Sequence, residues 1–127
     1  MKNRAAIILT LATLLVAATG SHAADPLGEA ARKAGRPLVA DFGQNLCKQC
    51  VLQSEAMDKF RNAVGDRIDT RFVHVVKEAE LTAPYKIVLI PTLIFYDRTG
   101  KEVFRQVGYM PFEDMMSKAG KLGLLAR

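Results

Sequence analysis

Residues 41–50 read D-F-G-Q-N-L-C-K-Q-C and contain both cysteines of a chain of 127 residues. Two cysteines this close make a poor structural cross-link, because closing so short a loop removes little entropy from the unfolded chain. Residues 38–42, apolar except for Asp41, predict a buried strand, and apolar residues recur at helical spacing from Cys47 to Val64. The stretch therefore predicts a reactive pair, Cys47 and Cys50, where a strand passes into a helix.

The rest of the chain alternates helices and strands. Strands are predicted over 38–42, 69–76, 92–96 and 102–107, and helices over 27–34, 47–64, 79–85 and 111–122. In the second helix the apolar residues that recur at helical spacing are Val51, Leu52, Met57, Phe60 and Val64. The first two strands, joined through a helix, should be parallel, and the last two should form an antiparallel hairpin. This order predicts an α/β fold with a mixed central sheet of about four strands and helices on both faces.

The N-terminus has the three parts of a secretory signal peptide. A basic stretch at 1–4 precedes an apolar run at 5–18, and Ser21 and Ala23 are small residues at the positions that a signal peptidase reads. The apolar run is shorter than the roughly 20 residues that cross a bilayer. We therefore predict a signal peptide over 1–23 and one domain over 24–127, with an uncleaved N-terminal anchor as the alternative.

Composition excludes several other function classes. Removal of residues 1–23 takes away Lys2 and Arg4 and lowers the formal net charge from +5 to +3. The chain has no long basic run and no interleaving of aromatic and basic residues, so nucleic-acid binding is not predicted. After residue 23 the only histidine is His74, too few ligands for a structural zinc site, and Val51 stands where haem attachment needs a histidine. No metal and no nucleic-acid partner is therefore expected.

With its cysteines at a strand-to-helix junction, the chain resembles the thioredoxin family, and in particular its exported thiol-disulfide oxidoreductases. The resemblance covers nearly all of residues 24–127. It rests on the motif at 41–50, on I-P-T at 90–92, on the D-R-T-G-K-E turn at 97–102 and on V-G at 107–108. It implies a thioredoxin fold and a redox-active disulfide that needs no further cofactor.

The resemblance assigns roles to three residues of the motif. A thiolate at a helix N-terminus is stabilised by unpaired backbone N–H groups, so Cys47 is expected to be the nucleophile. Cys50, one helical turn later, is expected to resolve the mixed disulfide. Asp41 should lie behind the cysteines and help to deprotonate Cys50; the alternative is that its carboxylate only bonds a nearby backbone N–H.

A substrate groove is implied beside the cysteines. In this family the bond before the matching proline is cis, so Ile90, Pro91 and Thr92 are expected to present their backbone to an extended substrate, and Gly108 to close the groove. Without the resemblance, a proline at an edge or at the start of a strand would be the default interpretation of Pro91.

Three departures from the family pattern alter the surface around the motif. Leu46 replaces the family's tryptophan before the first cysteine, Gly43 replaces an aromatic residue, and Lys48-Gln49 replaces Gly-Pro. The physiological substrate and the redox potential cannot therefore be inherited from thioredoxin.

The sequence as a whole predicts an exported, periplasmic-type protein-disulfide reductase. Its expected partners are protein thiol or disulfide substrates and a membrane thiol reductase as electron donor, and it should act as a monomer. The reducing direction follows because a buried Asp41 should oppose a thiolate more than an exposed Lys48 favours one. The alternative function is a non-enzymatic peptide-binding or assembly module that uses the groove beside Pro91.

Overall fold

The computed structural model describes residues 24–126, so the predicted signal peptide lies outside the described residues. Within that range, none of the helices combines the length and the apolar character needed to span a membrane. The strands are β1 (Leu38–Gly43), β2 (Asp69–His74), β3 (Thr92–Tyr96) and β4 (Glu102–Val107). The helices are α1 (Pro26–Ala34), α2 (Lys48–Val64), α3 (Ala79–Thr82) and α4 (Phe112–Lys121), with 3-10 turns at Gly65–Arg67 and Ala83–Tyr85.

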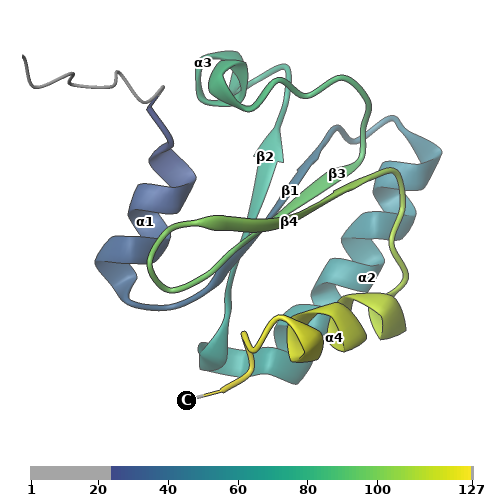
Figure 1. Ribbon diagram of the computed structural model, residues 1–127. Helices are drawn as coiled ribbons and strands as arrows, with labels where there is room; N and C mark the ends of the chain where they lie inside the picture. The colour runs from purple at the N-terminus through teal and green to yellow at the C-terminus, as the bar shows by residue number, and fades with distance from the viewer. Residues whose placement is uncertain (1–23, 127) are drawn as a thin grey trace, which may run out of the picture.

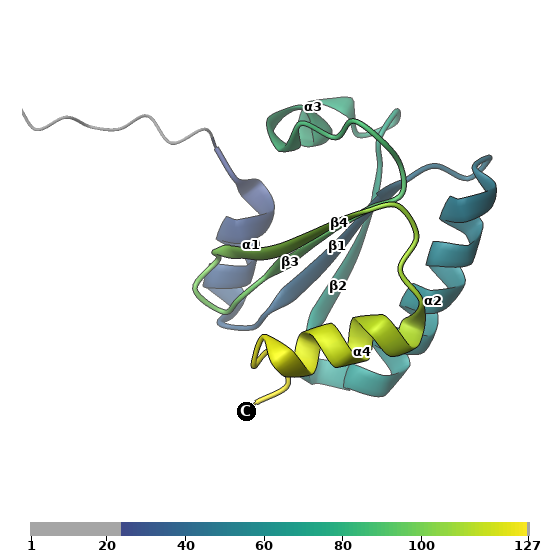
Figure 2. The same ribbon diagram turned by 45° about the vertical axis from the view of Figure 1, so that its right-hand side comes forward.

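The four strands form one mixed sheet in the order β2-β1-β3-β4. β2 runs parallel to β1, whereas β3 is antiparallel to β1, and β4 is antiparallel to β3. Figures 1 and 2 show α2 and α4 on one side of the sheet and α1 and α3 on the other. The predicted fold class is confirmed.

Each face of the sheet has its own hydrophobic core. On one face Val39, Leu93 and Phe95 pack against residues of α2 and α4. On the other face the core joins alternate strand residues to α1 and Tyr85; its strand members are Leu38, Ala40, Phe42, Val73, Ile94 and Tyr96. Because successive strand residues point to opposite faces, Asp41 shares the α2 face with Val39. The alternation of β1 therefore aims a carboxyl group toward the helix that carries the cysteines.

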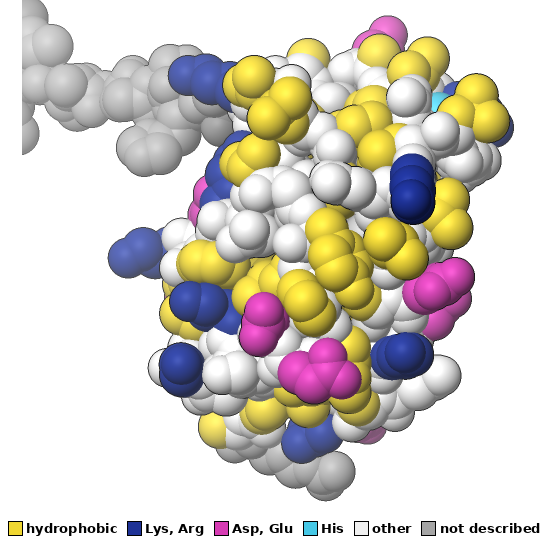
Figure 3. Space-filling model, turned by 90° about the vertical axis from the view of Figure 1, so that its right-hand side faces the viewer, with side chains coloured by type: hydrophobic (Ala, Val, Ile, Leu, Met, Phe, Trp, Pro, Cys, Tyr) yellow, Lys and Arg dark blue, Asp and Glu magenta, His cyan; other side chains and the backbone are white. Residues whose placement is uncertain are grey.

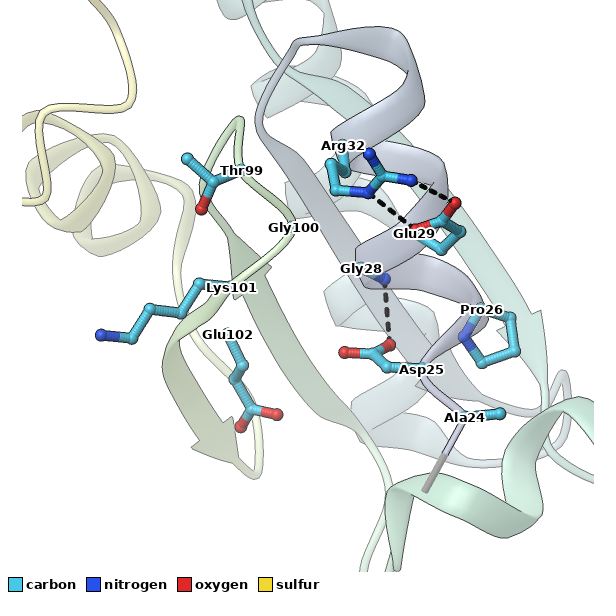
Figure 4. A pocket seen from close by; sticks show the side chains of 10 residues that line it. All are labelled: Ala24, Asp25, Pro26, Gly28, Glu29, Arg32, Thr99, Gly100, Lys101 and Glu102. Atoms are coloured by element: carbon cyan, nitrogen blue, oxygen red, sulfur yellow. Dashed lines mark hydrogen bonds and ion pairs between the residues drawn. The ribbon is translucent and has the colours of Figure 1, made fainter. Parts of the chain in front are cut away.

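The start of α1 packs directly on the hairpin turn between β3 and β4. Asp25 caps α1 by accepting a hydrogen bond from the Gly28 backbone N–H at 2.9 Å, and the Tyr85 hydroxyl donates to the same carboxylate oxygen at 2.9 Å. A Cβ on Gly28 would overlap the carbonyl oxygen of Gly100. Figure 4 shows the open hollow beside this contact, about 610 Å³ in volume, at the end of the sheet opposite the cysteines. The helix approaches the turn this closely because both residues are glycines.

Replacing Gly28 with alanine should lower the free energy of unfolding by about 1–3 kcal/mol, because the new methyl group meets backbone that cannot move aside cheaply. Gly120→Ala is the matched control, since the nearest atom to its new Cβ is a Leu125 methyl at 3.9 Å. Both glycines lie in helices, so the control should gain up to about 1 kcal/mol. Urea denaturation measures both variants, and equal effects would show that the contact with Gly100 does not matter.

Two of the apolar residues that recur at helical spacing in α2 are not buried. Val51 and Leu52 are 47% and 41% exposed, and Gln53 is fully buried. The buried stripe runs through Cys50, Gln53, Met57, Phe60 and Val64, a spacing of three and four residues that keeps one face of a helix toward the sheet. Val51 and Leu52 are apolar but lie off that stripe, so hydrophobicity alone does not predict which residues of α2 are buried.

Two element ends also differ from the prediction. β2 ends at His74, not at residue 76, because a turn begins there: the His74 carbonyl accepts from the Glu78 N–H at 2.8 Å. The predicted helix over 79–85 is α-helical only to Thr82 and continues as a 3-10 turn that contains Pro84. A proline has no N–H to continue the α-helical pattern.

Candidate active site

Cys47 is the N-cap residue of α2. Its backbone is extended (φ −90°, ψ 122°), and its Sγ accepts a hydrogen bond from the Cys50 backbone N–H at 3.3 Å. The first turn of α2 contains no acidic residue, so no side-chain carboxylate there offsets the positive end of the helix. A sulfur in this position occupies the place that an anion prefers at a helix N-terminus.

The two thiols have opposite pKa shifts. Hydrogen bonds from the Cys50 side chain, the Cys50 N–H and the Gln49 N–H lower the pKa of Cys47 and outweigh the opposing effect of burial. Burial raises the pKa of Cys50 to about 11, and its hydrogen bond to Cys47 and the charge of Asp41 act in the same direction. Both cysteines are free thiols in this structure. A half-buried thiol with a lowered pKa can act as a nucleophile, whereas a buried thiol with a raised pKa keeps its proton at neutral pH.

Asp41 is a buried carboxyl group on the same face of the sheet. Only 2% of the residue is exposed, and burial raises its pKa to about 7. Its Oδ1 has no hydrogen-bond partner among residues 24–126, so the structure provides no backbone donor for that oxygen. A carboxyl group with this pKa exchanges a proton close to neutral pH, where it can act as a general base.

The Pro91 segment lies across from Cys47. The Ile90–Pro91 peptide bond is cis, and the Ile90 carbonyl oxygen is 4.0 Å from the Cys47 Sγ. The buried Thr92 begins β3 and its hydroxyl donates to the Leu89 carbonyl at 2.7 Å. The Gly108 N–H donates to the Pro91 carbonyl at 2.8 Å. The segments that carry Ile90, Pro91, Thr92 and Gly108 therefore meet beside Cys47.

Exposed apolar side chains surround this meeting point. Leu46, which precedes Cys47, is 96% exposed. The others flank Ile90 and Gly108 along the chain: Val88, Leu89, Val107 and Tyr109. Figure 3 looks onto the side of the molecule where α2 begins, and hydrophobic side chains are spread over that face between scattered charges. A surface of this kind is suited to contact with another polypeptide.

Two features of the site were not anticipated from the sequence. The first is the buried Gln53, which its spacing of three residues from Cys50 could have placed on the inner stripe of α2. The second is a hollow of about 310 Å³ next to Cys50, lined by Gln44, Asn45, Cys50, Val51, Ser54 and Phe72. Gly43 is next to Cys50 and Phe72. A Cβ on this residue would lie 3.4 Å from the Cys50 Sγ and 3.3 Å from the Phe72 ring.

Among the residues that the structure describes, no cluster of three or more His, Cys, Asp or Glu side chains could hold a metal ion. The His74 Nδ1 accepts a hydrogen bond from the Lys77 N–H at 3.3 Å, which ties this imidazole to its own turn.

Comparisons with known proteins agree with this geometry. Two curated relatives are thioredoxins: that of Alicyclobacillus acidocaldarius is 29% identical over 63% of this chain and 75% of its own length. That of Mycoplasmoides gallisepticum is 32% identical over 63% of this chain and 78% of its own length.

Solved structures share the fold. Chloroplastic thioredoxin z superposes with a TM-score of 0.68 at 22% identity, covering 75% of this chain and 86% of its own. Thioredoxin-2 of the malaria parasite superposes with a TM-score of 0.65 at 24% identity, covering 68% and 82%. The family model described as a thioredoxin-like domain matches residues 28–122. The chain therefore belongs to the thioredoxin-like domain family.

Proposed function

We propose that this chain is an exported thiol-disulfide oxidoreductase that reduces disulfides of protein substrates through Cys47 and Cys50. The observation that carries the proposal is the pairing of a half-buried cysteine at a helix N-terminus, whose pKa is lowered, with a buried cysteine whose pKa is raised. This asymmetry separates an attacking sulfur from a resolving one.

In the proposed reaction the Cys47 thiolate attacks one sulfur of a substrate disulfide. The substrate S–S bond breaks, one substrate sulfur leaves as a thiolate, and the other becomes joined to Cys47. Cys50 then loses its proton and attacks the Cys47 Sγ, which forms the Cys47–Cys50 disulfide and releases the second substrate thiolate. Two electrons pass from the dithiol to the substrate, so an external donor must reduce the new disulfide.

Asp41 is the proposed acceptor of the Cys50 proton. With its pKa near 7 and that of Cys50 near 11, the carboxylate is available above neutral pH while the thiol is still protonated. Proton transfer to a buried carboxylate avoids the need for water to reach Cys50. The role that the sequence resemblance gives to Asp41 is retained here as a proposal.

The proposed substrate is an extended polypeptide held in the groove beside Cys47. Ile90, Pro91 and Thr92 would supply backbone groups, and Gly108 would leave room for the peptide to approach. The exposed Leu46 and Leu89 support a protein substrate, because apolar side chains at the rim of a groove contribute binding that a small disulfide cannot use.

The reducing direction is proposed from the causes of the Cys47 pKa shift. The groups that lower this pKa are hydrogen-bond donors, and the exposed Lys48 is not among them. A thiolate without a neighbouring cation is a poorer leaving group, and its disulfide is therefore harder to reduce. The negative charge of Asp41, once ionised, acts in the same direction.

The proposal also includes where the protein acts, what reduces it and its oligomeric state. The signal-peptide pattern of residues 1–23 supports export to an oxidising compartment such as the periplasm. A membrane thiol reductase would then supply the electrons that re-reduce the Cys47–Cys50 disulfide. We propose that the exported domain acts as a monomer.

The reducing direction predicts where the dithiol equilibrates with glutathione. The Cys47–Cys50 potential should lie nearer to thioredoxin, at about −270 mV, than to protein disulfide isomerase, at about −180 mV. The measurement is equilibration in glutathione buffers followed by thiol alkylation and mass spectrometry. Lys48→Ala is the control and should move the equilibrium constant less than about two-fold, because an exposed charge is screened. A pair that stays reduced in buffers that oxidise thioredoxin would identify an oxidant or isomerase instead.

A further inference from the structure

Gln53 is a buried polar side chain to which the proposed reaction assigns no step. It lies on α2, three residues after Cys50, and is fully buried. Burying an amide is unfavourable unless its donor and acceptor groups are paired. The partners of Gln53 therefore indicate what the residue does.

Both polar atoms of the Gln53 side chain form hydrogen bonds with the backbone of one residue, Met110. The Gln53 Oε1 accepts from the Met110 N–H at 2.8 Å, and the Nε2 donates to the Met110 carbonyl at 3.2 Å. The Met110 N–H can only donate, which fixes the orientation of the amide. The Nε2 also lies 3.5 Å from the Met115 Sδ on α4. Gln53 thus joins α2 to the segment between β4 and α4 by a two-point contact.

In the proposed function that segment forms one side of the substrate groove. It begins at Gly108, whose N–H donates to the Pro91 carbonyl at 2.8 Å, and continues through the exposed Tyr109 to the buried Met110. One end is therefore attached to the Pro91 segment, and the other is attached to α2 by Gln53. Cys47 caps the same helix, so the two-point contact relates the position of that segment to the position of the nucleophile.

We propose that Gln53 is a positioning residue that holds the 108–110 segment at a fixed distance from Cys47 and so favours protein substrates over small disulfides. This inference rests on the proposed function. A small disulfide needs only the Cys47 sulfur, whereas an extended peptide must fit between Cys47 and both segments of the groove. Loss of the contact should therefore act selectively on substrates that occupy the groove.

Gln53→Met tests the inference, because methionine has a similar length, suits a helix and cannot form either hydrogen bond. With dithiothreitol as electron donor, the KM for insulin should rise about ten-fold, as expected for two lost hydrogen bonds. The rate constant for 5,5′-dithiobis(2-nitrobenzoate) and the glutathione equilibrium constant should each change less than about two-fold. Lys59→Met places the same side chain at an exposed position of α2 and should behave as the original protein.

A second variant tests the inference in case Gln53→Met folds poorly. Gln53→Glu keeps an acceptor for the Met110 N–H, but an ionised carboxylate cannot donate to the Met110 carbonyl. Its KM for insulin should lie between those of the original protein and Gln53→Met, and should approach the original value as the pH is lowered and the glutamate is protonated.

The outcomes distinguish a failure of the positioning role of Gln53 from a failure of the proposed function. If the original protein is active and both Gln53 variants match it, or if they lose activity equally toward insulin and the small disulfide, the positioning role is wrong. If the original protein reduces neither substrate, the proposed function fails and the positioning role fails with it.

Discussion

Cys47→Ser should lower the rate of protein-disulfide reduction at least about a thousand-fold, to the background given by dithiothreitol alone. A serine hydroxyl at the N-cap of α2 is not ionised near neutral pH and cannot attack a disulfide. The hydroxyl can still accept a hydrogen bond from the Cys50 N–H, and serine is a preferred N-cap residue. The fold should therefore be preserved while the chemistry is lost. The measurement is insulin reduction, with circular dichroism as a check on folding.

Cys50→Ser is the matched counterpart, and it should also stop turnover, but at a later step. Cys47 can still attack a substrate, whereas the mixed disulfide cannot be resolved. Covalent complexes should therefore accumulate in non-reducing gels with Cys50→Ser and be nearly absent with Cys47→Ser. Equal trapping by the two variants would mean that the attacking and resolving sulfurs are wrongly assigned. A chain that trapped substrates without any turnover in its original form would instead fit the peptide-binding alternative.

The order of helices and strands was sufficient to predict a mixed α/β sheet, and the family resemblance supplied the thioredoxin fold. The sequence located the four strands, the parallel β1–β2 pair and the β3–β4 hairpin, because β1 and β3 are short apolar runs between turn residues and the Asp97–Gly100 turn favours a hairpin. The antiparallel pairing of β1 with β3 was not predicted. The buried faces of the helices were harder to predict. Val51 and Leu52 are apolar and exposed, since the surface around an active site exposes hydrophobic residues that average patterns place in a core.

The site could be predicted only in part, for a related reason. The motif identified Cys47 and Cys50, and the family resemblance placed Asp41 behind them. Gln53 was missed because its partner is the backbone of Met110, which lies 57 residues away and has no side-chain pattern. Pairing between a side chain and a distant backbone group depends on the packing of α2 against the β4–α4 segment, and that packing has no local signal in the sequence.

Asp41→Asn should stabilise the protein above neutral pH. The folded-state pKa of about 7 lies above the ordinary value of 3.8, so the folded state binds this proton more tightly than the unfolded state does. The associated stability is complete below about pH 4 and is lost as the pH rises to about 7. A shift of this size corresponds to about 4 kcal/mol, which asparagine should recover at pH 8 because it is uncharged.

Urea denaturation at pH 8 and pH 4 measures this difference, and the gain should nearly vanish at the lower pH. Asp66→Asn changes an exposed aspartate and should alter the free energy of unfolding by less than about 0.5 kcal/mol at either pH. A gain from Asp41→Asn that is the same at both pH values would show that the pKa of Asp41 is the same in the folded and the unfolded protein. If the gain in stability depends on pH as expected, the same substitution should also slow the resolution of the mixed disulfide by Cys50 about a hundred-fold, because the proton acceptor is gone. The buried Asp41 carboxylate destabilises the fold, and its proposed function as acceptor of the Cys50 proton explains why the protein has it.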